Sequence, residues 1–392
     1  MVYENILEPL GDTPVVRIRR LLPHPGDRIY VKLEGGNPSG SIKDRAALHM
    51  VEQAERKGLL ASGSTIVEST SGNLGKALAL IGAVKRYSVI LVVDPKTPRS
   101  VLSYATTLGA ELDMVTQPDA NGSFQSTRLR RVRELVERIP HAVTLNQYDN
   151  PDNAQAHATH TAPEIIKVFD DLGALIASVS TGGHLSGLGT ALKEHFPDLH
   201  VRAVDAVGSA AFGHPFAPYK MRGIGLSWTP GNLRAECVDS LHRVTDIEAL
   251  SLCRVLAAEE GILLGESGGA AVFAALTYAT AHPGRPVLAI APDSGANYLY
   301  ESYDDEWLRE HGVLPEVLSL TPGDVLRHSR LPAHAPTPLP VGLPVGLPVG
   351  AGGSGRPWGA EAQTVEEQGG DLPGFVLPAF GGAQVTDAAQ GA

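Results

Sequence analysis

The stretch STIVESTSGNLGKALALIGAVKRYSVILVVD, residues 64–94, predicts the fold of this chain. It begins and ends with short, mostly apolar segments, STIVEST and SVILVVD, which are typical of buried β-strands. Between them, NLGKALALIGAVK carries apolar residues at the spacing of a helix that packs on a sheet. A helix between two strands connects parallel neighbours, so the stretch predicts a parallel sheet covered by helices.

The same alternation continues along the chain. We expect further strands at RIYVKLE, ALIASVS, HVRAVDA and PVLAIAP. We expect further helices at AALHMVEQAERKG, TRLRRVRELVERI and LSGLGTALKEHF. Together they predict an α/β protein with mostly parallel sheets and helices on both faces. The folded unit would span residues 1–325, with a smaller lobe over about 40–145.

The composition is that of an ordinary globular protein, with 43% hydrophobic and 19% charged residues over 392 positions. The net charge of −11 argues against nucleic acid or an anionic membrane as a partner. No apolar run reaches the roughly 18 residues of a membrane span, and MVYENILEPLGDTP lacks the features of a signal peptide. Cys237 and Cys253 cannot form a disulfide framework, so we expect buried thiols in a cytoplasmic protein.

Two other features are expected to carry no chemistry. Residues 326–392 are rich in proline and glycine and contain an LPVG repeat, which predicts a disordered tail. A partner-binding role is the alternative for this tail. His157 and His160, in HATH, have no carboxylate or cysteine at ligand spacing, so we expect solvated helix histidines and no metal site.

Candidate binding residues lie in loops that follow strands, because ligands of parallel α/β sheets bind where the carboxyl ends of strands lead into helices. After STIVEST, residues 70–73 can offer hydrogen-bond donors to an anion, although one of them could simply cap the helix. After ALIAS, the glycines of STGGHLSG allow close approach of a phosphate. This second loop matches neither a P-loop nor the dinucleotide-binding fingerprint.

A lysine and a serine complete the set of candidate residues. Lys43 stands at a predicted helix start in NPSGSIKDR, where the helix dipole disfavours a cation and a surface lysine is the simplest interpretation. Ser267, in GESGGAA, fits a tight packing turn equally well. A nucleophilic lysine beside a phosphate site is, however, what pyridoxal phosphate chemistry requires. The helix dipole would then help to keep the Lys43 amine unprotonated.

The motifs NPSGSIKDR, ESTSGNLG, STGGHLSG and GESGGAA resemble, in order and spacing, those of the cysteine synthase and cystathionine β-synthase family of pyridoxal phosphate enzymes. The resemblance covers about residues 5–310 and implies a two-lobed type II fold, similar to the tryptophan synthase β subunit, a homodimer and amino-acid substrates. It implies that Lys43 holds the cofactor, Asn73 bonds its 3-hydroxyl and Ser267 faces its ring nitrogen. The remaining implied contacts are those of Thr70, Ser71 and Gly72 with the substrate carboxylate and of Ser180, Thr181, Gly182, Gly183 and His184 with the cofactor phosphate.

Three residues depart from the pattern of cysteine synthases. Leu74 stands where these enzymes have threonine, which removes a hydroxyl near the substrate carboxylate. Ser180 and His184 stand where the phosphate loop usually begins with glycine and ends with threonine. These departures argue against ordinary cysteine synthesis from sulfide.

The blocks VVDPK, QPDANG, LNQYDN, AVDAVGS and GIG resemble one subgroup, the N-(2-amino-2-carboxyethyl)-L-glutamate synthases. That resemblance implies O-phospho-L-serine and L-glutamate as substrates, in a route to 2,3-diaminopropionate for siderophores or peptide antibiotics. Arg128, Tyr148 and Ser180 are then candidates for binding the phosphate leaving group, while a solvated helix face is the alternative for Arg128. A cysteine synthase and a non-catalytic binding partner are the alternative functions.

Overall fold

The computed structural model describes residues 2–119 and 124–328, and its larger sheet contains six strands. All neighbouring strands in this sheet are parallel except the first pair, which is antiparallel. The strands predicted at RIYVKLE, ALIASVS, HVRAVDA and PVLAIAP are confirmed. Across the sheet the order is β1 (Val15–Arg17), β2 (Arg28–Leu33), β10 (Pro286–Ala291), β7 (Ala174–Ser178), β8 (His200–Ala206) and β9 (Ser240–Val244).

The smaller sheet contains four strands, all parallel. The stretch that predicted the fold forms its centre, because Thr65–Ser69 and Ser88–Val93 lie side by side with a helix between them in the sequence. The order across the sheet is β5 (Glu111–Met114), β4 (Ser88–Val93), β3 (Thr65–Ser69) and β6 (Ala142–Val143).

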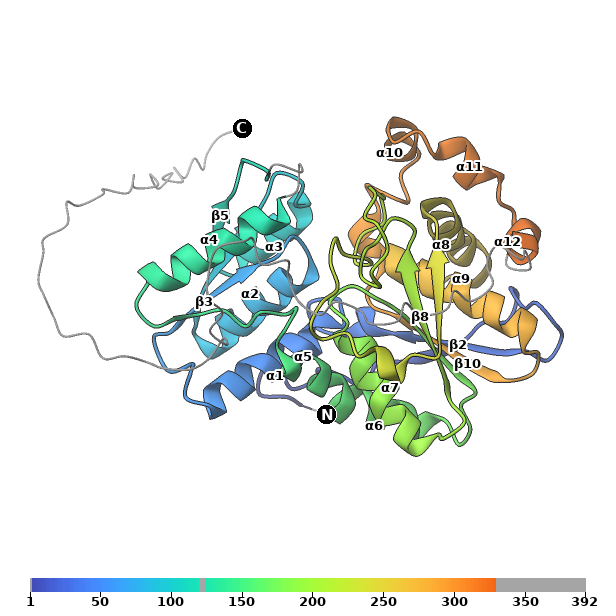
Figure 1. The fold of residues 1–392 in the computed structure, drawn as a ribbon, viewed down its shortest axis with the longest axis horizontal. Helices are drawn as coiled ribbons and strands as arrows, with labels where there is room; N and C mark the ends of the chain where they lie inside the picture. The colour runs from blue at the N-terminus through green and yellow to red at the C-terminus, as the bar shows by residue number, and fades with distance from the viewer. Residues whose placement is uncertain (1, 120–123, 329–392) are drawn as a thin grey trace, which may run out of the picture. The chain divides into compact units, whose positions relative to one another are not determined.

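Helices cover both faces of the larger sheet (Figure 1). Side chains of β10 alternate between the faces: Val287 and Ala289 pack with α8 and α9, whereas Leu288 and Ile290 pack with α6 and α7. The predicted α/β class is therefore confirmed. The α-helices are α1 (Lys43–Arg56), α2 (Asn73–Lys85), α3 (Arg99–Thr107), α4 (Gln125–Arg138), α5 (Pro151–Ala156), α6 (Ala162–Val168), α7 (Gly183–His195), α8 (Asp246–Glu260), α9 (Glu266–Ala281), α10 (Asp305–Glu310), α11 (Leu314–Ser319) and α12 (Pro322–His328).

Short helical turns join several of these elements. A π-helical turn, η2 (His157–Thr161), continues α5 into α6. Here the prediction of solvated histidines is wrong for His157, whose ring is buried against that of His184 because the turn faces α7. The 3₁₀ turns are η1 (Glu34–Gly36), η3 (Ala235–Cys237) and η4 (Gly295–Tyr298).

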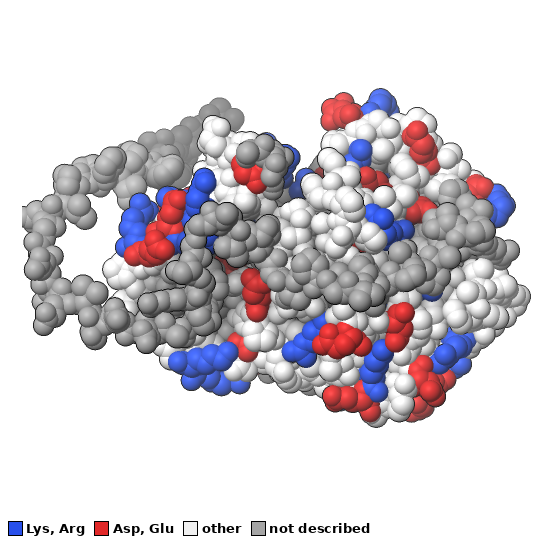
Figure 2. Space-filling model, in the orientation of Figure 1, with Lys and Arg blue, Asp and Glu red and all other residues white. Residues whose placement is uncertain are grey.

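Cys237 and Cys253 are free and buried, as the sequence predicts. None of the helices within the described ranges is long and apolar enough to cross a membrane. Acidic and basic side chains are intermixed over the face shown in Figure 2. Helix α12 runs to His328, past the predicted boundary at 326, and the rest of the predicted tail lies outside the described residues.

Candidate active site

A cavity of about 570 Å³ opens beside the carboxyl ends of β3, β4 and β7. This is where the switch from strand to helix in a parallel sheet leaves backbone N–H groups pointing outward. Most of the predicted site residues line it, namely Lys43, Thr70, Ser71, Gly72, Asn73, Arg128, Tyr148, Ser180 and Thr181. The predicted residues that do not line it are Gly182, Gly183, His184 and Ser267.

Lys43 is the first residue of α1, and its backbone N–H donates to Ser41 Oγ at 3.2 Å. Burial lowers the pKa of the Lys43 amine, and the nearby carboxylate of Asp293 acts in the opposite direction. A lowered amine pKa was expected from the helix dipole, but in the structure desolvation is the main cause. The neutral, nucleophilic form of Lys43 is thereby favoured.

The loop of residues 70–73 joins β3 to α2. Helix α2 begins without a side-chain cap, so its first-turn N–H groups are not satisfied by Ser71 or Thr70 as a simple capping role would require. Thr70 Oγ1 instead accepts from the N–H of Gly72 at 3.2 Å, and Asn73 Nδ2 donates to Asp293 Oδ2 at 2.7 Å. The uncapped helix start faces the cavity and suits a carboxylate.

The loop after β7 is packed too tightly for side chains at its glycines. Gly182 has a φ of +82°, and a Cβ there would lie 2.7 Å from the backbone nitrogen of Leu233. A Cβ on Gly183 would lie 2.2 Å from Asn153 Oδ1. Helix α7 begins here with no side-chain cap. The uncapped start of α7 therefore leaves backbone N–H groups without a side-chain acceptor, which is an arrangement that can bind a phosphate.

His184 and Ser267 lie behind the cavity wall. Burial, together with the positive charge of Lys43, lowers the pKa of His184 to about 3, so its ring is neutral at physiological pH. Ser267, in the first turn of α9, is buried behind Gly223, where a Cβ would lie 3.4 Å from Ser267 Oγ. Gly223, next to this hydroxyl, lines the cavity.

Arg128 is buried on the inner face of α4, with 6% of its surface exposed, so the interpretation as a solvated helix residue is wrong. Its neighbour Arg130 is 69% exposed at the side chain and has that solvated role instead. Arg128 Nε lies 3.2 Å from Asp94 Oδ2 in an ion pair, but neither Nε nor Nη1 of Arg128 has a hydrogen-bond partner among the described residues. Beside it, Tyr148 OH accepts from Gln125 Nε2 at 3.2 Å.

Several charged residues of the cavity were not predicted from the sequence. Asp94 and Lys96 follow β4, the neighbour of β3, and their place after a buried parallel strand was a usable signal. Arg222 and Glu301 come from irregular segments distant in the sequence. Their ion pair, with 2.8 Å between Arg222 Nε and Glu301 Oε2, depends on the tertiary fold.

Fold and site together define a class of α/β enzyme in which a half-buried lysine and the uncapped starts of helices that follow parallel strands lie around one cavity. A family model for pyridoxal-phosphate dependent enzymes matches residues 6–293, and this chain belongs to that family. The cysteine synthase-like fold and the pyridoxal phosphate cofactor predicted from the sequence are thereby confirmed.

Two proteins similar to this chain are named as synthases, and a third is a hydrogen sulfide-producing enzyme. N-(2-amino-2-carboxyethyl)-L-glutamate synthase of Cupriavidus metallidurans is 38% identical over 339 residues, 83% of this chain and 99% of its own length. A probable cysteine synthase of Bacillus subtilis is 40% identical over 76% of this chain and 96% of its own. The crystal structure of a hydrogen sulfide-producing enzyme of Fusobacterium nucleatum, 33% identical, covers 76% of this chain and 100% of its own, with a TM-score of 0.72.

The residues present fit pyridoxal phosphate. The glycine cradle at the start of α7 suits its phosphate, and the amine of Lys43 suits its aldehyde. Buried polar atoms without hydrogen-bond partners among the described residues, such as His184 Nε2 and Arg128 Nη1, lie around the same cleft. Within residues 2–119 and 124–328, no group of three or more His, Cys, Asp or Glu side chains could hold a metal ion.

Proposed function

We propose that this enzyme replaces the phosphate of O-phospho-L-serine with the amine of L-glutamate, giving N-(2-amino-2-carboxyethyl)-L-glutamate and inorganic phosphate. In the overall reaction the Cβ–O bond of O-phospho-L-serine breaks and a Cβ–N bond to glutamate forms. The glutamate nitrogen loses one proton, which leaves with the phosphate. The C. metallidurans relative carries the name of this activity.

Arg128 is the observation that carries the proposal. A buried guanidinium in the cavity wall with Nη1 unpartnered is costly unless an anion completes its hydrogen bonds. The hydroxyls of Tyr148 and Ser180 line the same cavity and can donate to the same anion. A phosphate leaving group satisfies this donor set better than an acetyl group, because it carries more charge and more acceptor oxygens.

Each remaining residue has a role that follows from its position. Lys43 holds the cofactor and, once released, removes and later returns the Cα proton, for which its lowered pKa suits it. The uncapped start of α2 and the hydroxyls of Thr70 and Ser71 hold the substrate carboxylate. Bound pyridoxal phosphate supplies an electron sink that acidifies the Cα–H bond.

Asn73, Ser267 and the phosphate loop complete the proposed cofactor contacts. Asn73 lines the cavity and is oriented by Asp293, so its amide can also donate to the cofactor 3-hydroxyl. Ser267 offers a neutral hydroxyl to the ring nitrogen from behind Gly223. The glycines and N–H groups of residues 180–184 hold the phosphate.

Product analysis tests the proposal. The purified enzyme with its cofactor is incubated with O-phospho-L-serine or O-acetyl-L-serine, each with L-glutamate or sulfide, and products are identified by mass spectrometry. We expect N-(2-amino-2-carboxyethyl)-L-glutamate from O-phospho-L-serine and glutamate. Arg128→Met should raise KM for O-phospho-L-serine about 10-fold or more, because a hydrogen-bonded charge pair is lost. Arg130→Met, on the exposed side of the same helix, is the matched control.

A cysteine synthase is the second candidate, and the 40% identity to the B. subtilis relative favours it. Cysteine formed from sulfide, with no product from glutamate, would establish this function instead of the first. Leu74, buried where cysteine synthases have threonine, argues in the other direction.

Three further expectations belong to the proposal. The product would serve as a precursor of 2,3-diaminopropionate for a siderophore or a peptide antibiotic. The enzyme would be a cytoplasmic homodimer, as the family resemblance implies. Light scattering at known concentration tests the dimer, because a monomer and a dimer of a 41.3 kDa chain differ twofold in mass.

A further inference from the structure

The charged side chains of the cavity are mostly paired with one another. Arg128 lies beside Asp94, with 3.2 Å between Nε and Oδ2. Arg222 is paired with Glu301 at 2.8 Å. Lys43 is the cofactor lysine of the proposed function. Lys96 is left as the cavity cation with no carboxylate partner among the ion pairs of the described residues.

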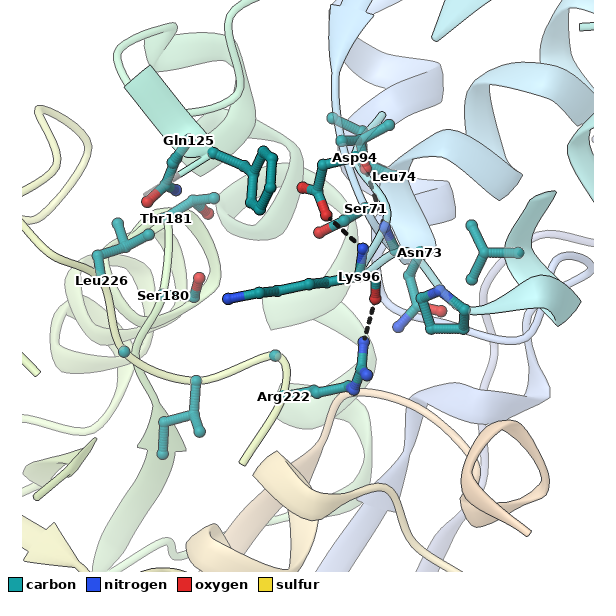
Figure 3. A pocket seen from close by; sticks show the side chains of 18 of the residues that line it. Ser71, Asn73, Leu74, Asp94, Lys96, Gln125, Ser180, Thr181, Arg222 and Leu226 are labelled. Carbon is teal, nitrogen blue, oxygen red and sulfur yellow. Dashed lines mark hydrogen bonds between the residues drawn. The ribbon is translucent and has the colours of Figure 1, made fainter. Parts of the chain in front are cut away.

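The side chain of Lys96 extends across the cavity in the direction of Ser180 and Leu226 (Figure 3). Its Nζ lies 5.7 Å from the centre of the Phe124 ring, which also lines the cavity. The face of an aromatic ring attracts an ammonium group but has no formal charge that would neutralise it. Lys96, although exposed to solvent, therefore brings its ammonium group into the cavity.

The backbone of Lys96 is held in place from both sides. Its N–H donates to Asp94 Oδ1 at 2.8 Å, and its carbonyl accepts from Arg222 Nη1 at 3.3 Å (Figure 3). The N–H of Arg222 donates in turn to Glu266 Oε2 at 2.5 Å, so the backbone of Arg222 is held by the first residue of α9. These bonds link the loop after β4 to the opposite wall of the cavity and fix the direction from which Lys96 enters it.

We infer that Lys96 binds a carboxylate of the amino acid that arrives second, and so selects an acidic nucleophile over sulfide. The inference rests on the proposed function. The start of α2 is assigned to the carboxylate of the first substrate, and Arg128 to its phosphate, so a second substrate with two carboxylates needs another cation. Lys96 is the unpaired cation that the described part of the cavity provides, and an ammonium–carboxylate bond is of the strong, charge-assisted kind.

Steady-state kinetics of Lys96→Met with L-glutamate varied at saturating O-phospho-L-serine test the inference. We expect KM for glutamate to rise about 10- to 100-fold, since one charge-assisted hydrogen bond is lost. Lys96→Arg should recover most of the affinity, and Lys96→Glu should lose more than Lys96→Met because it repels the substrate. Lys57→Met is the control, as Lys57 is an exposed lysine that does not line the cavity.

A second readout separates binding of the nucleophile from the first half of the reaction. The change in cofactor absorbance on adding O-phospho-L-serine alone should proceed in Lys96→Met at the wild-type rate. A slower change, or weaker retention of the cofactor, would overturn the inference, because Lys96 would then serve the phosphate groups. An unchanged KM for glutamate in Lys96→Met, with a wild type that uses glutamate, overturns this inference alone. A wild type that accepts only sulfide overturns the proposed function as well.

Discussion

Asn73 donates its side-chain amide to Asp293 Oδ2 across 2.7 Å, which joins the first residue of α2 to the second residue after β10. Asp293 Oδ2 also accepts from the hydroxyl of Tyr298 at 2.7 Å. The bond links the two sheets, because α2 packs against β4 of the smaller sheet and Asp293 follows β10 of the larger sheet. Asp293 thereby fixes the direction of the Asn73 amide.

Asp293→Ala should lower the free energy of unfolding by about 1–3 kcal/mol, because the buried hydroxyl of Tyr298 and the half-buried amide of Asn73 lose their acceptor. Urea denaturation followed by circular dichroism measures the loss. Asp293→Asn keeps one acceptor oxygen and should cost less. Equal losses in the two variants would show that charge rather than hydrogen bonding is what Asp293 contributes.

Lys43→Ala should abolish covalent attachment of the cofactor and reduce turnover on the order of 10²–10⁴-fold, since the same amine is the proposed base. Loss of the visible absorbance band of the protein-bound cofactor reports the first effect. Lys76→Met is the control: Lys76 also feels the charge of Asp293, but its Nζ bonds Asn297 Oδ1 at 3.1 Å and it does not line the cavity. A band that survives in Lys43→Ala and disappears in Lys76→Met would exchange the roles of the two lysines.

Gly182→Ala should weaken cofactor binding and stability together. The positive φ of +82° costs an alanine about 1–2 kcal/mol, and the new Cβ also overlaps the backbone of Leu233. Gly63→Ala provides a matched control, because Gly63 has a φ of +86° and nothing within 4 Å of a new Cβ. Gly63→Ala should therefore be destabilised only by the cost of an alanine at a positive φ. Its cofactor affinity, measured by fluorescence titration, should equal that of the wild type. Equal cofactor affinities in the two variants would contradict the cradle.

Glu164 makes the free energy of unfolding depend on pH in the acid range. Its burial alone would raise its pKa, but hydrogen bonds from Arg45 and Lys32 outweigh burial and lower the pKa to about 2 from 4.5. The folded state therefore binds fewer protons than the unfolded state between these values. The stabilisation is complete above about pH 4.5 and is lost as the pH falls towards 2.

Glu164→Gln should consequently lower the free energy of unfolding at neutral pH by about 1–3 kcal/mol, with a smaller difference from wild type near about pH 3.5. Glu52→Gln is the control, because Glu52 pairs with Arg56 at the surface, where such pairs contribute about 0–1 kcal/mol. Denaturant titrations across the pH range measure both variants. If the difference in free energy of unfolding between Glu164→Gln and the wild type grows as the pH falls, this mechanism is contradicted.

Much of the fold was predictable because the apolar segments are short, regular and separated by helices. The strands at STIVEST and SVILVVD, and the helix between them, lie where their periodicity placed them. Lys43, Asn73 and the phosphate loop could be selected because four motifs together resemble, in order and spacing, those of one enzyme family, although each motif alone also fits a simpler structural role. The burial of His157 was missed because it depends on a π-helical turn that faces α7.

The sequence by itself determined the alternation of strands and helices, and it predicted the loops proposed to bind phosphate and carboxylate and the lysine proposed to hold the cofactor. These depend on local spacing and on residue chemistry, which neighbours along the chain decide. Only the tertiary structure decided that burial depresses the pKa of Lys43, that Arg128 faces inward, and that Lys96 is left unpaired in the cleft. Each of these depends on partners hundreds of positions apart or on exclusion of water by packed elements, and no local pattern encodes either.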